Sequence, residues 1–308
     1  MTTLYITHEA FLAHAGPPGH PERPDRLRAI ARAVDGEPGL NLARLEAPIA
    51  DFEAITRVHG PAFVERLRKA EPETGIVAID ADTYLSAGSV EAARRAAGAA
   101  ILAVDRVIAG EADNAFCAVR PPGHHAESAR AMGFCLFNSA AIAAAHARAV
   151  HGLARVAIVD FDVHHGNGSQ EIFWREPAVL YASTHQMPLY PGTGAASETG
   201  AGNIFNAPLR PGDGGAAFRA AMNHTILPAV DRFAPELVVV SAGFDAHLRD
   251  PLAQLELTET DFAWATGKLV ALARTHASGR LVSLLEGGYD LTGLARSVVA
   301  HLQVLVAG

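Results

Sequence analysis

Short apolar runs recur along the chain and are separated by longer segments with helical patterning. The runs are rich in Val, Ile, Leu and Ala. Several are apolar throughout, which is typical of strands that are buried on both faces of a parallel sheet. The predicted strands are Leu4–Ile6, Ala115–Val119, Val156–Asp160, Val179–Ser183, Leu237–Ser241 and Leu281–Leu285.

Helices are predicted between these strands. Their expected bounds are Asp25–Val34, Pro61–Ala70, Val90–Ala109, Phe137–Val150, Ser169–Trp174 as the start of a helix, Ala216–Phe233, Glu259–Thr275 and Leu294–Val306. Pro228 is expected to kink or divide its helix, because proline has no N–H to donate. Strands that alternate with helices indicate an α/β fold, with a mainly parallel sheet and helices on both faces.

The remaining segments are rich in Gly, Pro and polar residues. His14–Arg26 is predicted to be a loop and Ala81–Ser89 a polar turn. Gln186–Asn203 is predicted to be a long loop, and loops of that length are uncommon unless they are functional. The 308 residues contain no repeat, low-complexity tract or linker, so we expect a single domain over residues 1–308.

Composition narrows the class of protein. The net charge of −8 argues against a nucleic-acid-binding surface and is compatible with a cationic substrate. Cys117 and Cys135 are too few for a disulfide framework or a Cys-based zinc site, which makes a reducing compartment the default. We expect no secretory signal and no membrane span, because no apolar run reaches about 18 residues. The expected location is the cytoplasm.

The segment Val156–Gly168 changes from an apolar strand to a polar cluster. Asp160, Asp162, His164 and His165 crowd the predicted end of the strand. Residues two apart on an extended chain point to the same side, so Asp162 and His164 can direct an oxygen and a nitrogen at one point. These are two ligands for a divalent metal, most simply Zn²⁺. For the triplet alone, helix capping by solvent-facing side chains is the alternative.

Polar clusters follow three other predicted strands. Asp245 is the candidate for a third metal ligand, and a helix N-cap or a salt bridge to Arg249 is its alternative role. Two carboxylates and one imidazole would leave an open position for a water molecule, whose pKa zinc lowers to about 7. Ligands of parallel α/β folds bind at the carboxyl ends of the strands, so these clusters can converge on one crevice.

His124 and His125 follow a Pro-Pro-Gly turn at a strand end. They could act as general base and general acid, with Asp160 and Asn167 as acceptors that fix the tautomer. Two surface histidines are the alternative. Tyr289 follows two glycines, and its phenol could donate a hydrogen bond to a developing oxyanion or could pack on a loop rim.

Aromatic residues flanked by Gly or Pro could form the walls of a narrow apolar tunnel. Phe134 follows Gly133, and Tyr190 precedes a proline. Ordinary core packing is the alternative, and for Phe134 alone it is the favoured one. Cys135 is expected to be a small buried residue, because no base is assigned to activate its thiol.

Five motifs occur in the order and approximate spacing of the zinc-dependent histone deacetylase family. They are Arg120–Ala126, Gly133–Ser139, Asp160–Gly168, Ser241–Asp245 with Asp250-Pro251, and Leu285–Asp290. The chain most resembles the class II branch and its bacterial amidohydrolase relatives, from about His20 to the C-terminus. The resemblance implies the arginase–deacetylase fold, with about eight strands.

The resemblance also implies roles for individual residues. The implied zinc ligands are Asp162, His164 and Asp245. The implied catalytic residues are His124, His125, Tyr289, Asp160 and Asn167, with His125 the favoured general base and acid. The implied substrate-binding residues are Gly133, Phe134 and Tyr190, the more loosely aligned Asp82, and Leu252. A structural K⁺ is implied near Asp160, Asp162, His164, Ser183 and Thr184.

Two comparisons within this resemblance narrow the chemistry. Arginase-type ureohydrolases share the fold but need two further carboxylates for a second metal, and Gly166 and His247 occupy those positions here. A mononuclear site therefore fits better. Leu252 stands where a polyamine-selective relative carries Glu, which favours acyl-lysine substrates.

The expected activity is removal of an acetyl or related acyl group from a lysine side chain of a peptide or protein. Acetylpolyamine hydrolysis is the first alternative, and a non-catalytic acyl-lysine-binding protein is the second. Iron(II) is an alternative metal, since aspartate and imidazole accept either ion. A homo-oligomer is compatible with the resemblance, because dimer contacts narrow the tunnel in bacterial acetylpolyamine hydrolases.

Overall fold

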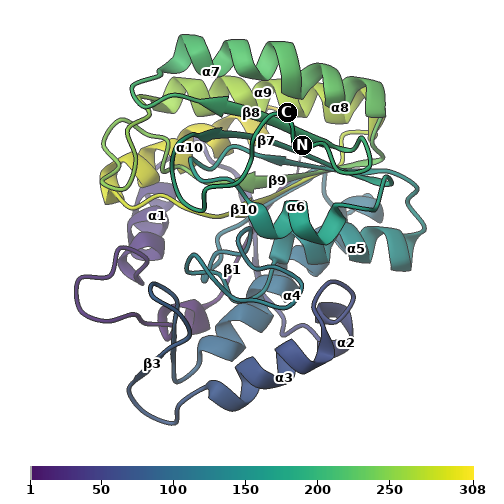
Figure 1. The fold of residues 1–308 in the computed structure, drawn as a ribbon. Helices are drawn as coiled ribbons and strands as arrows, with labels where there is room; N and C mark the ends of the chain where they lie inside the picture. Colours follow the sequence, from purple (N-terminus) through teal and green to yellow (C-terminus); the bar gives the residue numbers. More distant parts are fainter. Residues whose placement is uncertain (1) are drawn as a thin grey trace.

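The computed structural model describes residues 2–308, and its centre is one parallel sheet of eight strands (Figure 1). The strand order is β2-β1-β5-β10-β9-β6-β7-β8, and each neighbouring pair is parallel. The strands are Thr3–Thr7 (β1), Leu42–Glu46 (β2), Asn114–Cys117 (β5), Val156–Asp160 (β6), Val179–Gln186 (β7), Ile204–Leu209 (β8), Leu237–Ala242 (β9) and Leu281–Leu285 (β10). The predicted α/β class and parallel sheet are confirmed.

Helices cover both faces of this sheet (Figure 1). On one face lie Ser89–Ile108 (α4), Ser139–His151 (α5) and Asn167–Phe173 (α6). On the other lie Asp25–Asp35 (α1), Gly215–Ala221 (α7), Leu227–Phe233 (α8), Glu259–His276 (α9) and Leu291–Ala307 (α10). The shorter elements are Glu9–Leu12 (η1), Phe52–Ile55 (α2), Pro61–Ala70 (α3), Met222–Ile226 (η2), and the hairpin of Ile76–Ala78 (β3) and Tyr84–Ser86 (β4).

The apolar patterning of the central strands follows from this layering. Strands β6, β9 and β10 are buried along their whole length, as expected for strands with helices on both faces. Small residues let α4 pack closely against its neighbours. At Gly98, for example, a Cβ would overlap the carbonyl of Pro48.

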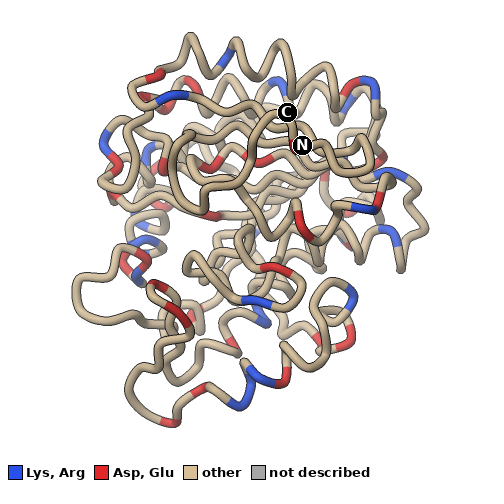
Figure 2. The backbone as a smooth tube through the Cα atoms, in the orientation of Figure 1, with Lys and Arg blue, Asp and Glu red and all other residues tan. Residues whose placement is uncertain are grey.

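Lys and Arg are spread over the outer helices and loops (Figure 2). Among residues 2–308, no helix combines the length and apolarity that crossing a membrane requires.

The two edge strands were not predicted individually. In β2 only Leu42 and Leu45 are partly shielded, and the other three residues are exposed, so the run has no clear apolar pattern. β8 contains Pro208, which a central strand would not tolerate, but a sheet edge tolerates proline because no further strand needs its N–H. Edge strands are therefore not found when strands are predicted from continuous apolar runs alone.

Two other segments differ from prediction. Ala81–Ser89 was expected to be a turn, but its central part forms β4, which pairs with β3. Ala216–Phe233 was expected to be one helix with a kink, but it consists of α7, a π-helical turn and α8. Pro228 lies in the first turn of α8, where its missing N–H is tolerated, and the wider π turn precedes it.

Two buried histidines make the fold sensitive to acid. His301 contacts Thr266 Oγ1 at 2.7 Å and Ser283 Oγ at 2.9 Å, and burial lowers the pKa of His301 to about 3. Burial also lowers the pKa of His59 to about 4. An unfolded histidine titrates near 6.5, so below that pH the unfolded chain binds more protons than the folded chain. The contribution of these two histidines to stability is therefore complete above about pH 6.5 and is lost as the pH falls toward 4.

Each of these histidines is protonated in the unfolded chain but not in the folded chain as the pH falls from 7 to 5. We expect each to lower the free energy of unfolding by about 2 kcal/mol over this range. Urea unfolding of His301→Asn at both values should show a pH-dependent loss that is smaller than that of the unmodified chain by about this amount. His224→Asn, at an exposed position, is the control and should keep the full pH dependence. Equal pH dependence in both variants would show that His301 is not a source of the effect.

Candidate active site

Four loops meet at one edge of the sheet. They follow β5, β10, β9 and β6, which are consecutive in the sheet. Because these strands are all parallel, their carboxyl ends lie at the same edge, where ligands of open α/β sheets bind. Residues 120–127, 161–167, 243–250 and 286–290 are thereby brought together from distant parts of the chain.

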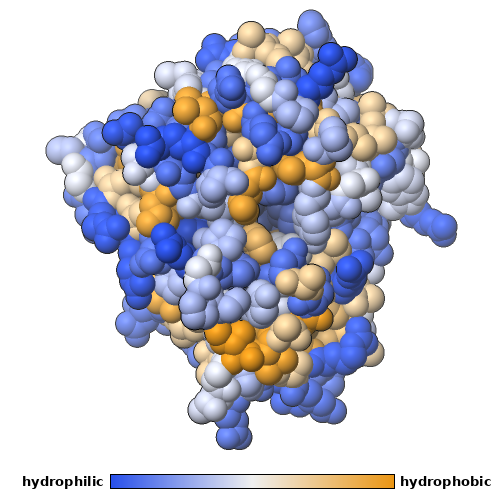
Figure 3. Space-filling model, turned by 60° about the vertical axis from the view of Figure 1, so that its left-hand side comes forward, coloured by the Kyte–Doolittle hydropathy of each residue, from blue (hydrophilic) through white to orange (hydrophobic). Residues whose placement is uncertain are grey.

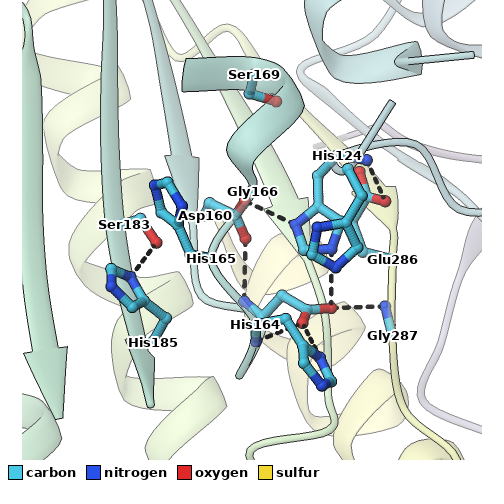
Figure 4. A network of polar contacts seen from close by, with 12 residues as sticks. His124, Asp160, His164, His165, Gly166, Ser169, Ser183, His185, Glu286 and Gly287 are labelled. Atoms are coloured by element: carbon cyan, nitrogen blue, oxygen red, sulfur yellow. Dashed lines mark hydrogen bonds and ion pairs between the residues drawn. The ribbon is translucent and has the colours of Figure 1, made fainter. Parts of the chain in front are cut away.

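Asp162, His164 and Asp245 lie at the centre of this edge (Figure 4 shows the surroundings of His164). His164 Nδ1 is 3.1 Å from Asp162 Oδ1 and 3.0 Å from Asp245 Oδ2. One potential ligand atom from each residue lies within 4.8 Å of the others, and all three residues are buried. Strand β6 ends at Asp160, so a bend after the strand brings Asp162 and His164 together, and the predicted alternation of an extended chain does not.

Backbone amides hold the two carboxylates in place. Gly287 N–H donates to Asp162 Oδ2 at 2.8 Å, and Val163 N–H donates to Asp245 Oδ1 at 2.8 Å. A Cβ at Gly287 would overlap both carboxylates. Glycine is therefore required for the loop after β10 to approach the cluster this closely.

The charges of this cluster fit a divalent cation. Burial opposes a charged His164, but hydrogen bonds and charges from the two carboxylates raise its pKa to about 10. Burial, together with the neighbouring Asp162 carboxylate, raises the pKa of Asp245 to about 7. A divalent cation relieves the repulsion between adjacent buried carboxylates, and oxygen and imidazole ligands suit zinc or iron(II).

The rings of His124 and His125 lie against each other at a tilt of 43°, with centroids 4.0 Å apart. Nδ1 of His124 lies 3.0 Å from Asp160 Oδ2, and Nδ1 of His125 lies 2.8 Å from Asn167 Oδ1. Burial opposes charge on His124, but Asp160 and Asp162 raise its pKa well above the usual value. Burial and, to a smaller extent, the charge of His124 lower the pKa of His125 well below the usual value. The arrangement thus favours a charged His124 beside a neutral His125.

A pocket of about 220 Å³ opens beside these residues. Its lining residues are Asp82, His125, Gly133, Phe134, His164, Leu189, Tyr190, Leu252 and Tyr289. All five predicted substrate-binding residues are among them, and Leu189 is an addition to the predicted set. One face of the molecule is hollowed near its middle, with hydrophobic and polar residues side by side around the hollow (Figure 3). The substrate-binding roles of these residues stay a prediction.

Gly133 and Phe134 form a tight turn in the pocket wall, with φ values of 56° and 67°. A Cβ at Gly133 would overlap the ring of His125, so glycine is needed both for the backbone and for the close approach. Phe134 is fixed from two sides. Its N–H donates to Thr83 Oγ1 at 3.1 Å, and the ring of His20 packs edge-on against it at 4.7 Å.

Tyr289 is held in the pocket by Arg26, whose guanidinium lies 4.9 Å from the centre of the phenol ring. Arg26 Nε donates to Gly288 O at 2.6 Å, and Nη2 donates to Glu286 O at 2.5 Å. Asp250 Oδ2 accepts from the Tyr289 N–H at 2.7 Å. Burial raises the pKa of Tyr289 well above the usual value, although Arg26 opposes the shift. The phenol therefore stays protonated and can donate a hydrogen bond.

The buried ion-pair network behind the pocket was not predicted. Glu22 binds both Arg26 and Arg120, whose side chains are fully buried. Glu286 Oε2 accepts from the N–H of Gly123 at 2.6 Å and of His124 at 3.1 Å. Charged residues inside Gly/Pro-rich loops are the only sequence signal of this network, and that signal does not say which residues pair.

Two paired strands contain part of the potassium site that the family resemblance implies. Asp160 in β6 lies opposite Ser183 in β7, next to Thr184. The Ser183 hydroxyl is 2.8 Å from Nδ1 of His185, whereas Thr184 Oγ1 is buried and has no hydrogen-bond partner among the described residues. This unsatisfied oxygen is compatible with a cation nearby, and the potassium site stays a prediction.

A second cluster of metal-ligand types lies between α4 and α5. Nε2 of His146 and Nε2 of His151 are each 2.7 Å from Asp105 Oδ1. Arg57 Nη1 lies 3.1 Å from Nδ1 of His146, and a guanidinium can only donate. A neutral His146 therefore carries its proton on Nε2, the atom that a metal would need. Hydrogen bonds satisfy this cluster without a metal.

Comparison with known proteins gives a consistent result. The model for the histone deacetylase domain matches residues 20–305. The histone deacetylase-like amidohydrolase of Pseudomonas aeruginosa is 44% identical over 280 residues, which are 88% of this chain and 73% of the relative. A probable deacetylase of Archaeoglobus fulgidus is 41% identical over 301 residues, which are 95% of this chain and 83% of the relative.

Solved structures agree with the sequence comparison. The crystal structure of the HDA15 HD domain has a TM-score of 0.94 and 38% sequence identity with this chain. The match covers 99% of this chain and 88% of the other.

Proposed function

The chain belongs to the histone deacetylase family, and on this basis we propose that it is a zinc-dependent amidohydrolase that removes acetyl or related acyl groups from lysine side chains. The observation that carries the proposal is the convergence of three potential metal ligands, a neutral histidine and a protonated tyrosine on one narrow pocket. Residues 1–308 are proposed to form one catalytic domain.

A divalent cation bound by Asp162, His164 and Asp245 would supply a Lewis acid that lowers the pKa of water and polarises an amide carbonyl. The chain's own groups carry the other steps. His125, neutral and with Nδ1 bound to Asn167, accepts a proton from the attacking water through Nε2.

The tyrosine and the charged histidine act on the developing negative charge. Tyr289 donates a hydrogen bond to the former carbonyl oxygen as the water oxygen bonds to the carbon. His124, held charged by Asp160, adds positive charge behind the reacting atoms. The C–N bond then breaks as protonated His125 donates its proton to the leaving nitrogen. A carboxylic acid and an amine are released, and both histidines return to their initial states.

The pocket's shape supports a substrate with a slender apolar stem. The ring of Phe134 packs nearly perpendicular to that of Tyr289, and the ring of Tyr190 packs nearly perpendicular to that of His125, with centroids 5.8 Å and 5.2 Å apart. Such walls match the methylene chain of a lysine, and Asp82 at the same pocket offers a carboxylate to a substrate N–H. Leu252 leaves this part of the wall without the carboxylate that would attract a distant ammonium.

Acetate release by the zinc-loaded protein tests this proposal. We expect kcat/KM to be higher for an acetyl-lysine peptide than for N-acetylputrescine, because the pocket wall at Leu252 carries no charge for the second amine. A higher value for N-acetylputrescine would assign the protein to polyamine substrates. If neither these substrates nor longer acyl-lysine peptides were hydrolysed, the enzymatic proposal would be wrong. Parallel loading with iron(II) would identify the more active metal.

A further inference from the structure

A carboxylate lies behind the amide that holds His125. Asn167 Oδ1 faces Nδ1 of His125 at 2.8 Å, and Asn167 Nδ2 donates to Glu127 Oε1 at 2.8 Å. The other neighbours of Nδ2 are also acceptors, the His125 carbonyl at 3.4 Å and Met132 Sδ at 3.3 Å. Glu127 is the nearest of the three and the one that carries charge.

The orientation of this amide decides which nitrogen of His125 carries the proton. As the amide stands, Oδ1 of Asn167 can only accept, so Nδ1 of His125 must be the N–H and Nε2 is free to accept a proton. In the reversed amide, the NH₂ group would donate to Nδ1. Neutral His125 would then carry its proton on Nε2 and could not act as a base from that atom.

Glu127 opposes the reversed amide. Reversal would place Asn167 Oδ1 against a Glu127 oxygen, and two acceptors at hydrogen-bond distance repel each other. We propose that Glu127 is a positioning residue that selects the amide orientation of Asn167 and so keeps His125 in the tautomer that can act as a base. This rests on the proposed function, because it assigns a purpose to the tautomer of His125.

The same contacts explain why the amide of Asn167 is paired with the carboxylate of Glu127. An aspartate at 167 would present acceptors on both sides and could hold Nδ1 of His125 without help. It would also place two carboxylates at hydrogen-bond distance, where they repel. Glu127 should therefore assist catalysis only when residue 167 is an amide.

A double-mutant cycle measures this dependence. In the zinc-loaded protein, Glu127→Ala should lower kcat roughly tenfold with little change in KM, because one charged hydrogen bond selects the amide orientation. Glu127→Gln keeps an acceptor and should recover most of that loss. In the Asn167→Asp background, Glu127→Ala should leave kcat unchanged or raise it, because it removes the repulsion. Glu53→Ala, whose carboxylate is 89% exposed, is the control.

Nitrogen NMR of the metal-loaded, ¹⁵N-histidine-labelled protein gives a readout that needs no turnover. We expect the His125 signals, assigned by their loss in His125→Ala, to show a protonated Nδ1 and an unprotonated Nε2. Glu127→Ala should mix in the other tautomer, and Glu127→Gln should restore the first. Folding should survive, since the backbone bonds of Glu127 to His59 and Arg130 do not involve its side chain.

The results separate this inference from the proposed function. An equal loss of kcat on Glu127→Ala in both backgrounds, or an unchanged tautomer, would overturn the role of Glu127 while leaving the deacylase proposal intact. Absence of turnover by the unmodified protein would refute the deacylase proposal, and the NMR result would then still report whether Glu127 sets the tautomer.

Discussion

Replacing Asp245 by Ala is expected to lower kcat/KM for an acetyl-lysine peptide by at least about 10³-fold, because the proposed metal would supply several kcal/mol of transition-state stabilisation. Asp245 Oδ2 is 3.0 Å from His164 Nδ1, so its loss removes one of the three proposed metal ligands. Two ligands hold a divalent cation far less firmly than three. Zinc content after gel filtration, measured by mass spectrometry, should fall from about one per chain toward zero.

An exposed aspartate provides the matched control. Asp51→Ala, at the start of α2, should keep both zinc content and activity. Dialysis of the unmodified protein against a chelator should reproduce the loss of activity seen with Asp245→Ala, and added Zn²⁺ should restore it only in the unmodified protein. Full activity in zinc-free Asp245→Ala protein would contradict the assignment of this cluster as the metal centre.

Replacing Tyr289 by Phe is expected to lower kcat by about 10²–10³-fold, the usual cost of removing one oxyanion donor. The ring should keep its place between Arg26 and Phe134, so KM should change little. Zinc content should not change, because the three proposed ligand atoms belong to Asp162, His164 and Asp245. Initial rates with an acetyl-lysine peptide, combined with metal analysis, separate this variant from one that has lost its ligands.

A second tyrosine serves as the control for this substitution. Tyr5→Phe removes a phenol oxygen from β1, where the ring packs against Phe116 away from the pocket, and kcat should stay within the range of the unmodified protein. An intact kcat in Tyr289→Phe on every acylamide tested would show that Tyr289 does not stabilise the oxyanion. A fall in zinc content would point instead to a structural role near the metal ligands.

The central part of the fold could be predicted from local sequence, because a strand that is buried on both faces consists almost entirely of apolar residues. Strands β6, β9 and β10 are buried along their length and apolar at all but one position each, and their polar continuations contain Asp162, Asp245 and Tyr289. Parallel strands place such continuations at one edge, so the convergence of these residues follows from topology. The edge strand β2 is largely exposed and the edge strand β8 contains a proline, so neither shows a continuous apolar run in the sequence.

The sequence alone determined which chemical groups stand at the strand ends and that they share one edge of an α/β sheet. Only the tertiary structure decided how those groups are oriented. The bend after β6, the Arg26 contact with Tyr289 and the Glu127–Asn167–His125 chain join residues from separate segments. Burial restricts the type of residue at each position, so a local sequence pattern reveals which residues are buried. Hydrogen-bond direction depends on which distant side chain comes within about 3 Å, and only the folded chain sets that distance.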